Sequence, residues 1–314
     1  MNIILTLFIF IFIFIFIYQP PQPLASRAWG VRSREVYGEM KRLENKHRRY
    51  VPEESWLKFR RVLVDWMCEA GDEFQLHIST MHVAVMYLDR MLQSLQIPRH
   101  KLQLVAVACI LIAAKFEEME EVVPTISDMN RYAQRAFIPE EIQNTEVVVL
   151  NRLDWSLTTF TPLHFSSYFV SEGVLFHEDR MKGRELVDKV LKYVKRYIDF
   201  FADLCLQDYS FQKHSPSLMA AAIIMASRKA LSIRPLWRSE LAILTEFEQH
   251  EVAPCFDAIW KCYRKNFPNA PLPADEATSS PTGVEEMVDG SAHAMTTSSK
   301  YGSVDPVNLH SAVF

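Results

Sequence analysis

The chain has 314 residues and a formal net charge of −4, so it has room for two domains and no strong electrostatic bias toward nucleic acid. It contains eight glycines, about a third of the usual share, and four of them fall between residues 31 and 267. Few tight turns are therefore available for a many-stranded sheet. Because good helix formers dominate the same region, we predict an all-α fold.

The chain begins with an apolar, low-complexity segment that we assign to residues 1–30. Residues 3–18 alternate largely between Ile and Phe and are slightly shorter than the roughly 20 residues of a membrane span. One interpretation is a non-functional extension from an erroneous start, which the repetitive alternation favours. The other is a membrane anchor, in which case Arg27, Arg32 and Arg34 would keep the rest of the chain on the cytosolic side. Membrane contact is expected only under the second interpretation.

A basic segment follows the apolar one. Residues 27–61 hold eleven Lys or Arg against five Asp or Glu. A solvated helix face explains this excess better than an arm that binds nucleic acid, and no nucleic-acid partner is expected. We predict an N-terminal helix and linker over residues 31–54.

Ten helices are predicted between residues 55 and 267. Prolines at or before helix starts and apolar periodicity set their limits, with Ser79 and Ser215 as expected N-caps. The predicted helices span residues 55–73, 79–95, 100–117, 125–135, 139–152, 162–174, 184–206, 215–230, 237–246 and 249–266. We assign the first five to one domain, residues 55–158, and the last five to a second, residues 159–267.

An alanine-bearing apolar segment occurs twice in the chain. LVAVACILIAAK at residues 104–115 aligns with LMAAAIIMASRK at residues 218–229. Eleven apolar residues are too few to span a membrane, so each segment is predicted to be a helix surrounded by other helices. Alanines in mid-helix let neighbouring helices approach closely. Two tandem five-helix bundles, each with one such helix at its centre, are the expected architecture.

The chain ends in a segment, residues 268–314, that is rich in Pro, Ser, Thr, Asp and Glu and lacks hydrophobic periodicity. Such a composition predicts a disordered acidic tail. Ser280 precedes Pro281 and forms a minimal proline-directed phosphorylation site. A turnover signal and an inert tail are both consistent with this segment.

No motif for catalysis or metal binding is present in the sequence. Phosphate-binding glycine loops, zinc-protease motifs, nucleophile elbows and the motif set of protein kinases are all missing. The cysteines show no CxxC spacing, which favours reduced thiols that fill space over metal ligands. They are Cys68, Cys109, Cys205, Cys255 and Cys262. We expect a protein that is not an enzyme and uses no cofactor and no metal.

Four sequence blocks, in this order, carry a family resemblance. They are FRRVLVDWM (59–67), YLDRML (87–92), KLQLVAVACILIAAKFEE (101–118) and LDW (153–155). The chain resembles the cyclin family over residues 33–267, which covers both cyclin boxes. SPSLMAAA at residues 215–222 is most similar to cyclins of the J type, and the first box is nearly as similar to the A and B types.

The resemblance implies a regulatory subunit that binds and activates a cyclin-dependent protein kinase and thereby controls cell-cycle progression, in the nucleus and cytoplasm. It assigns kinase contacts to Lys115, Phe116, Glu146 and Trp155. From the residues alone, the position of Lys115 is explained equally well by a structural role within its own helix. A cation near the C-terminal end of a helix is favoured by the helix dipole by about 0.3–1 kcal/mol.

A second candidate site lies at residues 59–69. Phe59, Val62, Leu63 and Trp66 follow the spacing of one helical face, which burial in a core also explains. The resemblance implies a docking patch for RxL-type substrate or inhibitor peptides, made of Phe59, Val62, Leu63, Trp66, Glu69 and Gln103. The sequence departs from the family pattern there, with Phe59 in place of Met and Arg61 in place of Ala.

Arg60 and Asp89 match a buried ion pair that joins the first two helices of the first box in the family. We therefore expect a structural role for both residues. Removing one partner of a buried pair leaves an uncompensated charge.

Two alternative functions are kept. General transcription factors of the TFIIB type share tandem five-helix boxes, but they predict a basic face and a zinc ribbon, and the sequence contains no paired cysteines for a ribbon. A membrane-tethered scaffold with a cyclin fold is the other alternative. The presence of Lys115 and Glu146 argues for retained kinase binding, whereas residues 3–18 keep tethering open.

Overall fold

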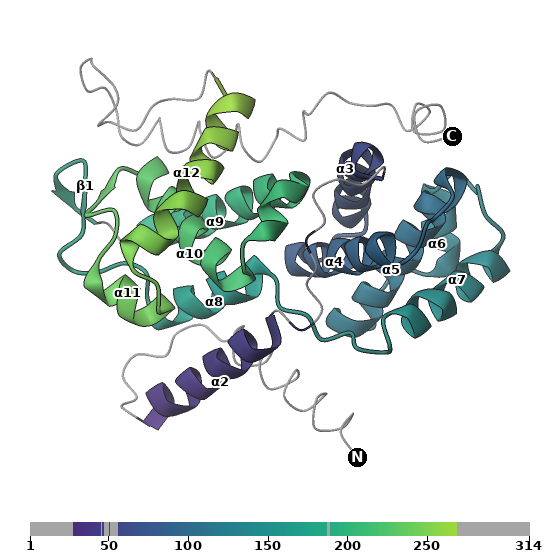
Figure 1. The fold of residues 1–314 in the computed structure, drawn as a ribbon, viewed down its shortest axis with the longest axis horizontal. Coiled ribbons are helices and arrows are strands. Elements are labelled where there is room, and N and C mark those ends of the chain that lie inside the picture. Colours follow the sequence, from purple (N-terminus) through teal and green to yellow (C-terminus); the bar gives the residue numbers. More distant parts are fainter. Residues whose placement is uncertain (1–27, 45, 47–49, 51–55, 187–188, 269–314) are drawn as a thin grey trace.

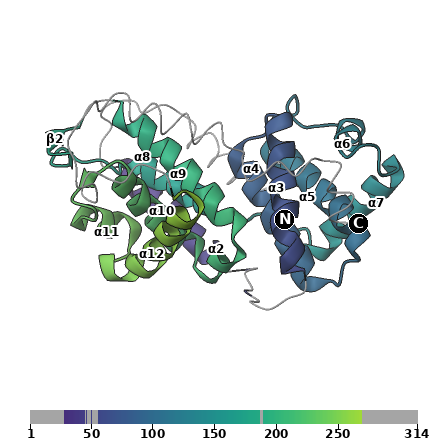
Figure 2. The ribbon, with the colours of Figure 1, turned by 90° about the horizontal axis from the view of Figure 1, so that it is seen from above.

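The computed structural model describes residues 28–44, 46, 50, 56–186 and 189–268. The apolar segment at residues 3–18 and the predicted tail with Ser280 lie outside the described residues. Two helical bundles stand side by side in both views of the ribbon (Figures 1 and 2).

The N-terminal bundle, blue in Figure 1, follows the predicted order of five helices. Its helices are α3 (Leu57–Glu73), α4 (Ile78–Ser94), α5 (Leu102–Glu117), α6 (Ile126–Tyr132) and α7 (Pro139–Arg152). A short 3-10 turn, η1 (Arg99–Lys101), precedes α5.

The C-terminal bundle, green in Figure 1, also has five α-helices. They are α8 (Pro162–Glu172), α9 (Val190–Gln207), α10 (Pro216–Ala230), α11 (Ser239–Thr245) and α12 (Gln249–Asn266), with a 3-10 turn, η2 (Tyr209–Lys213), after α9. The prediction of two tandem five-helix bundles is confirmed for the part of the chain that is described.

Three short strands in the C-terminal bundle were not predicted. β1 (Arg180–Met181) pairs antiparallel with β2 (Arg184–Glu185) and with β3 (Ile233–Arg234), in the order β2-β1-β3. The helix expected at residues 184–206 therefore begins only at Val190. Gly183 turns the chain with φ of 78°, and strands of two residues are too short to show an alternating pattern.

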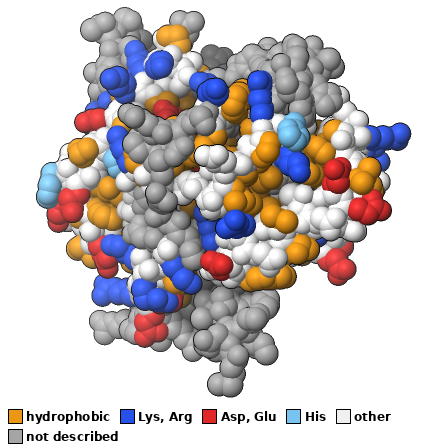
Figure 3. Space-filling model, turned by 45° about the vertical axis from the view of Figure 1, so that its right-hand side comes forward, with side chains coloured by type: hydrophobic (Ala, Val, Ile, Leu, Met, Phe, Trp, Pro, Cys, Tyr) orange, Lys and Arg blue, Asp and Glu red, His pale blue; other side chains and the backbone are white. Residues whose placement is uncertain are grey.

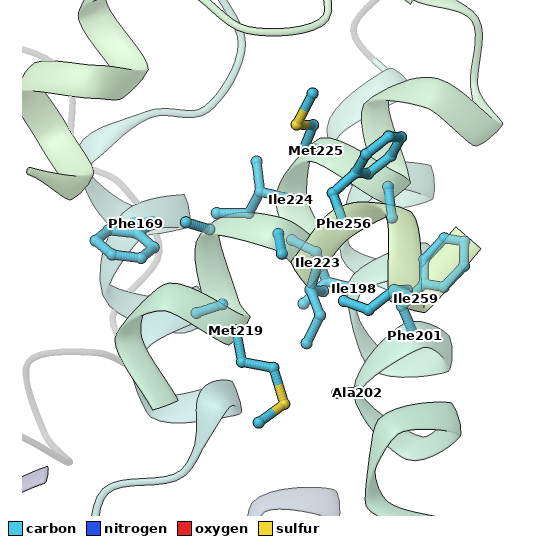
Figure 4. Close-up of a cluster of buried hydrophobic side chains, with 14 of the residues drawn as sticks. Phe169, Ile198, Phe201, Ala202, Met219, Ile223, Ile224, Met225, Phe256 and Ile259 are labelled. Carbon is cyan, nitrogen blue, oxygen red and sulfur yellow. The ribbon is translucent and has the colours of Figure 1, made fainter. Parts of the chain in front are cut away.

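Each bundle is built around its alanine-bearing helix. Every residue of α5 from Leu102 to Ala114 is buried, and α10 is buried nearly as completely. Figure 4 shows Ile223 and Ile224 of α10 among apolar side chains such as Phe169 of α8 and Phe201 of α9. The predicted central position of both repeats is confirmed.

The two helix caps expected from the sequence have different outcomes. Ser215 caps α10, because its hydroxyl accepts a hydrogen bond from the Leu218 N–H at 3.3 Å. The expected cap at Ser79 is wrong. His77 caps α4 instead, and its Nδ1 accepts from the Ser79 N–H at 3.2 Å.

An N-terminal helix, α2 (Ala28–Glu44), packs on the C-terminal bundle. The Tyr37 hydroxyl donates to the Thr245 carbonyl at 2.6 Å. The Glu44 carboxylate accepts from the N–H of Ser217 at 2.9 Å and so caps the start of α10 from outside that helix. The first described helix thus completes the second bundle.

Polar contacts join the two bundles. His82 of α4 and Asp203 of α9 are 3.0 Å apart, and the amide of Gln93 donates to the Tyr209 hydroxyl at 3.0 Å. Among the described residues, no helix has both the length and the apolar character to cross a bilayer.

Candidate functional site

Lys115 and Glu146 lie together where α5 reaches the surface. The Lys115 ammonium donates to Glu146 Oε1 of α7 at 2.5 Å. The Lys115 side chain is 49% exposed, whereas that of Glu146 is 10% exposed. A nearly buried carboxylate needs such a partner, so the pair fixes the amine at the edge of the α5–α7 contact.

The two glutamates that follow Phe116 anchor the end of α5 to the protein. Glu117 is buried, with its Oε2 3.8 Å from His164 Nε2 at the start of α8. Glu118 Oε1 accepts from the His77 N–H at 2.6 Å and from the Thr80 hydroxyl at 2.7 Å. These contacts hold the segment in place beneath Lys115 and the half-buried Phe116.

Trp155 projects from a strained turn after α7. Its side chain is 66% exposed, and both it and Asp154 have left-handed backbone angles, with φ of 55° and 52°. The indole N–H donates to Asn151 Oδ1 at 3.1 Å. A non-glycine residue in this region of backbone space must be held by its surroundings.

Arg90 holds the turn that carries Trp155. Its guanidinium donates to the carbonyl of Ser156 at 2.9 Å and to that of Leu153 at 3.1 Å. The sequence-based prediction missed this role. Arg90 stands beside Asp89 in YLDRML, which was the only available signal.

Three apolar side chains near this site are more than half exposed. They are Met119, just after α5, and Val147 and Val148 on α7. The sequence-based prediction did not include them. Three valines in a row interrupt the polar outer face that such a helix usually has, and α7 buries only one of them, Val149. This run was the signal that could have identified Val147 and Val148. Figure 3 turns the N-terminal bundle toward the viewer and shows hydrophobic side chains gathered beside charged ones.

The residues of the predicted docking patch divide into two groups. Leu63, Trp66 and Gln103 are buried, whereas Phe59, Val62 and Glu69 are half-buried at the outer side of α3. Leu63 and Trp66 belong to the hydrophobic core of the N-terminal bundle. The apolar surface on this side of α3 therefore comes mainly from two side chains.

Arg60 and Asp89 form a buried, two-pronged ion pair. Arg60 Nε and Nη2 donate to the two Asp89 oxygens at 2.7 and 2.9 Å. Nη1 also donates to the carbonyl of Leu206 at 2.9 Å. The pair joins α3 to α4, and the additional bond reaches α9 in the other bundle.

The C-terminal bundle has its own buried ion pair, which the sequence did not reveal. Arg228 of α10 donates to both oxygens of Asp179 at 2.8 and 2.7 Å, and both side chains are fully buried. Further bonds run from Arg228 to the carbonyls of Val174 and Pro235. This pair fixes the loop between α8 and α9.

The titratable groups of the described region give no sign of a metal site. No group of three or more His, Cys, Asp or Glu side chains there could hold a metal ion. Burial raises the pKa of Cys255 to about 12 and that of Cys205 well above its usual range, so these thiols stay protonated. The absence of metal and cofactor chemistry remains an expectation.

Comparison with known proteins identifies the two bundles. The family model of the cyclin N-terminal domain matches residues 35–158. The family model of the cyclin C-terminal domain matches residues 160–282. Cyclin-J of Xenopus laevis is 31% identical over 211 residues, which cover 65% of this chain and 54% of that protein. A cyclin-J-like protein of Mus musculus is 29% identical over 215 residues, or 66% of this chain and 56% of its own length.

A cyclin of another type and a solved structure also match this chain. Cyclin-D of Ostreococcus tauri is 32% identical over 201 residues, 62% of this chain and 53% of that protein. The chain thus spans about half the length of these curated relatives. A viral cyclin from herpesvirus saimiri has the same fold, with a TM-score of 0.55 and 19% identity over 76% of this chain and 98% of that one. With both of its domains matched, the chain belongs to the cyclin family.

Proposed function

We propose that this chain is a non-catalytic regulatory subunit that binds and activates a cyclin-dependent protein kinase. The observation that carries the proposal is the Lys115–Glu146 pair, in which the half-exposed lysine at the end of the buried α5 helix is held by a nearly buried carboxylate of α7. Exposed Val147, Val148 and Trp155 lie on α7 and just after it. Interfaces combine apolar and aromatic anchors with a few charged groups in this way.

Lys115 would contribute donors to the kinase. An ammonium has three N–H groups, and the hydrogen bond to Glu146 uses one of them. We propose that the others donate to carbonyl groups at the mobile αC helix of the kinase and the adjacent strand. Trp155 and Phe116 would cover apolar surface of the kinase beside these bonds.

The activating step follows from the requirements of the kinase. Phosphoryl transfer needs an ion pair between a lysine of the kinase and the αC glutamate, and the position of αC controls whether that pair forms. A rigid surface that binds only the active position of αC shifts the equilibrium by its differential affinity for the two states. The buried α5 helix supplies the rigidity, and this chain contributes no group to the chemistry.

Replacing both members of the pair tests the proposal. We expect the Lys115→Ala, Glu146→Ala double variant to keep its helical circular-dichroism spectrum while losing kinase in a pull-down read by mass spectrometry. The control variant is Lys182→Ala, which changes an exposed lysine between β1 and β2. It should retain the kinase. Unchanged kinase recovery and unchanged kinase activity in the double variant would refute the proposal.

The same pull-down addresses localisation. We propose that the protein works in the nucleus and cytoplasm, with the cyclin boxes on the cytosolic side if residues 3–18 anchor it. Chains with and without residues 1–25 should then recover the same kinase, and only an anchor would move the full chain into the membrane fraction.

We also propose that the outer side of α3 docks RxL-type peptides. Phe59 and Val62 would contact the peptide leucine above a floor of buried Leu63 and Trp66. Glu69 would accept hydrogen bonds from the peptide arginine, since arginine and carboxylate pair well. This surface is separate from the one proposed to bind the kinase.

A further inference from the structure

The outer side of α3 carries opposite charges at its two ends. Lys58 lies in the first turn and is exposed, whereas Glu69 and Glu73 lie near the last turn, half-buried and exposed respectively. A rotation of about 100° per residue places these side chains and Val62 on one side of the helix. The helix dipole favours anions at the start and cations at the end. The observed order is the reverse, so helix stability does not explain it.

The basic end is built around an aromatic ring. The Lys58 ammonium lies 4.9 Å from the centre of the Phe59 ring, and the Arg99 guanidinium carbon lies 4.6 Å from it. Both cationic residues are exposed, and Arg99 comes from the η1 turn before α5. An aromatic face attracts and orients cations. An anion that approaches Phe59 therefore meets two cations from two elements.

Aromatic rings pack on one another near the acidic end of α3. Tyr132 of α6 packs 5.6 Å from Trp66 of α3. Burial raises the pKa of Tyr132 to about 12, and the negative charges of Glu69 and Glu73 add to the effect. Burial and the neighbouring Asp72 raise the pKa of Glu69. An added cation would stabilise the ionised carboxylates at this end.

We propose that this side of α3 selects an extended peptide with a fixed order of charges. A basic residue would lie over Glu69 and Glu73, apolar residues over Val62 and Phe59, and an acidic residue beside Lys58 and Arg99. The inference rests on the docking function proposed above and adds the acidic residue to it. The rise of α3 from Lys58 to Glu69 is about 16 Å at 1.5 Å per residue. An extended peptide covers this length in about five residues.

Fluorescence-polarisation titration of the full chain tests the charge order. Three labelled peptides share an arginine and a leucine two residues later. They differ only at the fourth residue after the arginine, which lies on the same side of an extended peptide and is Glu, Gln or Lys. We expect the Glu peptide to bind roughly threefold tighter than the Gln peptide, and the Lys peptide roughly threefold weaker, as for exposed ion pairs. Added salt should reduce these differences.

Charge-reversed variants assign the preference to residues. In the Lys58→Glu, Arg99→Glu double variant, the Lys peptide should bind tightest and the Glu peptide weakest. The matched control Lys182→Glu, at an exposed lysine of the other bundle, should keep the order of the original chain. A preference for Glu that persists in the double variant would overturn the inference.

The remaining outcomes separate the two proposals. Equal affinities for all three peptides would overturn the charge order and leave docking on α3 intact. Failure of every peptide to bind would overturn docking on α3, and the inference with it. Kinase recovery, measured on the same preparations, reports on the other surface and is expected to stay unchanged in these variants.

Discussion

At the scale of single residues, Asp89 and its partner Arg60 join helices of both bundles. Both of its oxygens accept hydrogen bonds from Arg60, which also bonds to the Leu206 carbonyl of the second bundle. The aromatic ring of Tyr209 lies 5.2 Å from the same guanidinium. The ion pair therefore stabilises the contact between bundles as well as the contact between α3 and α4.

Asp89→Ala should destabilise the protein severely. Loss of the carboxylate leaves the Arg60 cation buried without its counter-charge, which costs about 3–5 kcal/mol. We expect insoluble protein, or a melting temperature far below that of the original chain by differential scanning fluorimetry. The comparison variant is Asp257→Ala, at an exposed position of α12, which should melt normally. A soluble Asp89→Ala protein with normal melting would contradict the assignment.

At the scale of helices, α7 has an outer side that is unusually apolar. Val149 is buried while Val147 and Val148 are exposed, and Glu146 precedes them as the partner of Lys115. Exposed valines on a helix that also carries a positioned charge are better explained by a partner surface than by packing within the bundle.

Charging α7 should weaken kinase binding without unfolding the bundle. Val147→Lys and Val148→Lys each replace an exposed side chain, so the melting temperature should stay within a few degrees. Each loses an apolar contact worth about 1–2 kcal/mol, which lowers kinase affinity roughly tenfold in surface plasmon resonance. Ile243→Lys, at an exposed isoleucine of α11, is the matched control and should bind kinase normally. Equal affinities for all three variants would exclude α7 from the interface.

The helices also show what sequence could and could not predict. α5 and α10 were identified from their apolar runs because burial on all sides leaves no polar face. The start of α9 was misplaced because β2 bonds to β1, and β1 to β3 from much later in the chain. The roles of Arg90 and Arg228 depend on carbonyl groups far away in sequence, and side-chain patterns do not report the positions of carbonyl groups. For Lys115 and Glu146, the family resemblance supplied the pairing.

At the scale of the whole molecule, half-buried acids lie on α3 and α9, two helices that meet where the bundles join. Burial raises the pKa of Asp65 on α3 and of Asp199 on α9 to about 6 in each case. The negative charge of Asp203 raises the pKa of Asp199 further and also raises that of Asp72 on α3. The positive charge of Arg61 partly lowers the pKa of Asp65, and that of Lys195 partly lowers the pKa of Asp199. At neutral pH the contact therefore holds carboxylates that would be better solvated in the unfolded chain.

The pH dependence of stability should reflect these acids. An acid with a raised pKa in the folded state binds its proton more tightly there, so the free energy of unfolding rises as pH falls from about 7 toward 5. Asp199→Asn removes the cost at neutral pH, a gain of at most about 3 kcal/mol, and should flatten the pH profile. Melting temperatures at pH 5, 6 and 7.5 would measure this. A variant whose profile runs parallel to that of the original chain would contradict the raised pKa.

The position of α2 has a consequence for how the protein is made. Tyr37 bonds to Thr245, 208 positions later, and Glu44 caps a helix 173 positions away. At translation rates of 5–20 residues per second, the ribosome needs roughly 10–40 s to reach these partners. During that interval Tyr37 can meet its earlier partners Tyr168 and Phe169 of α8, but the rest of its native surface is missing. The first described helix can therefore complete its docking only after the last part of the second bundle has been synthesised.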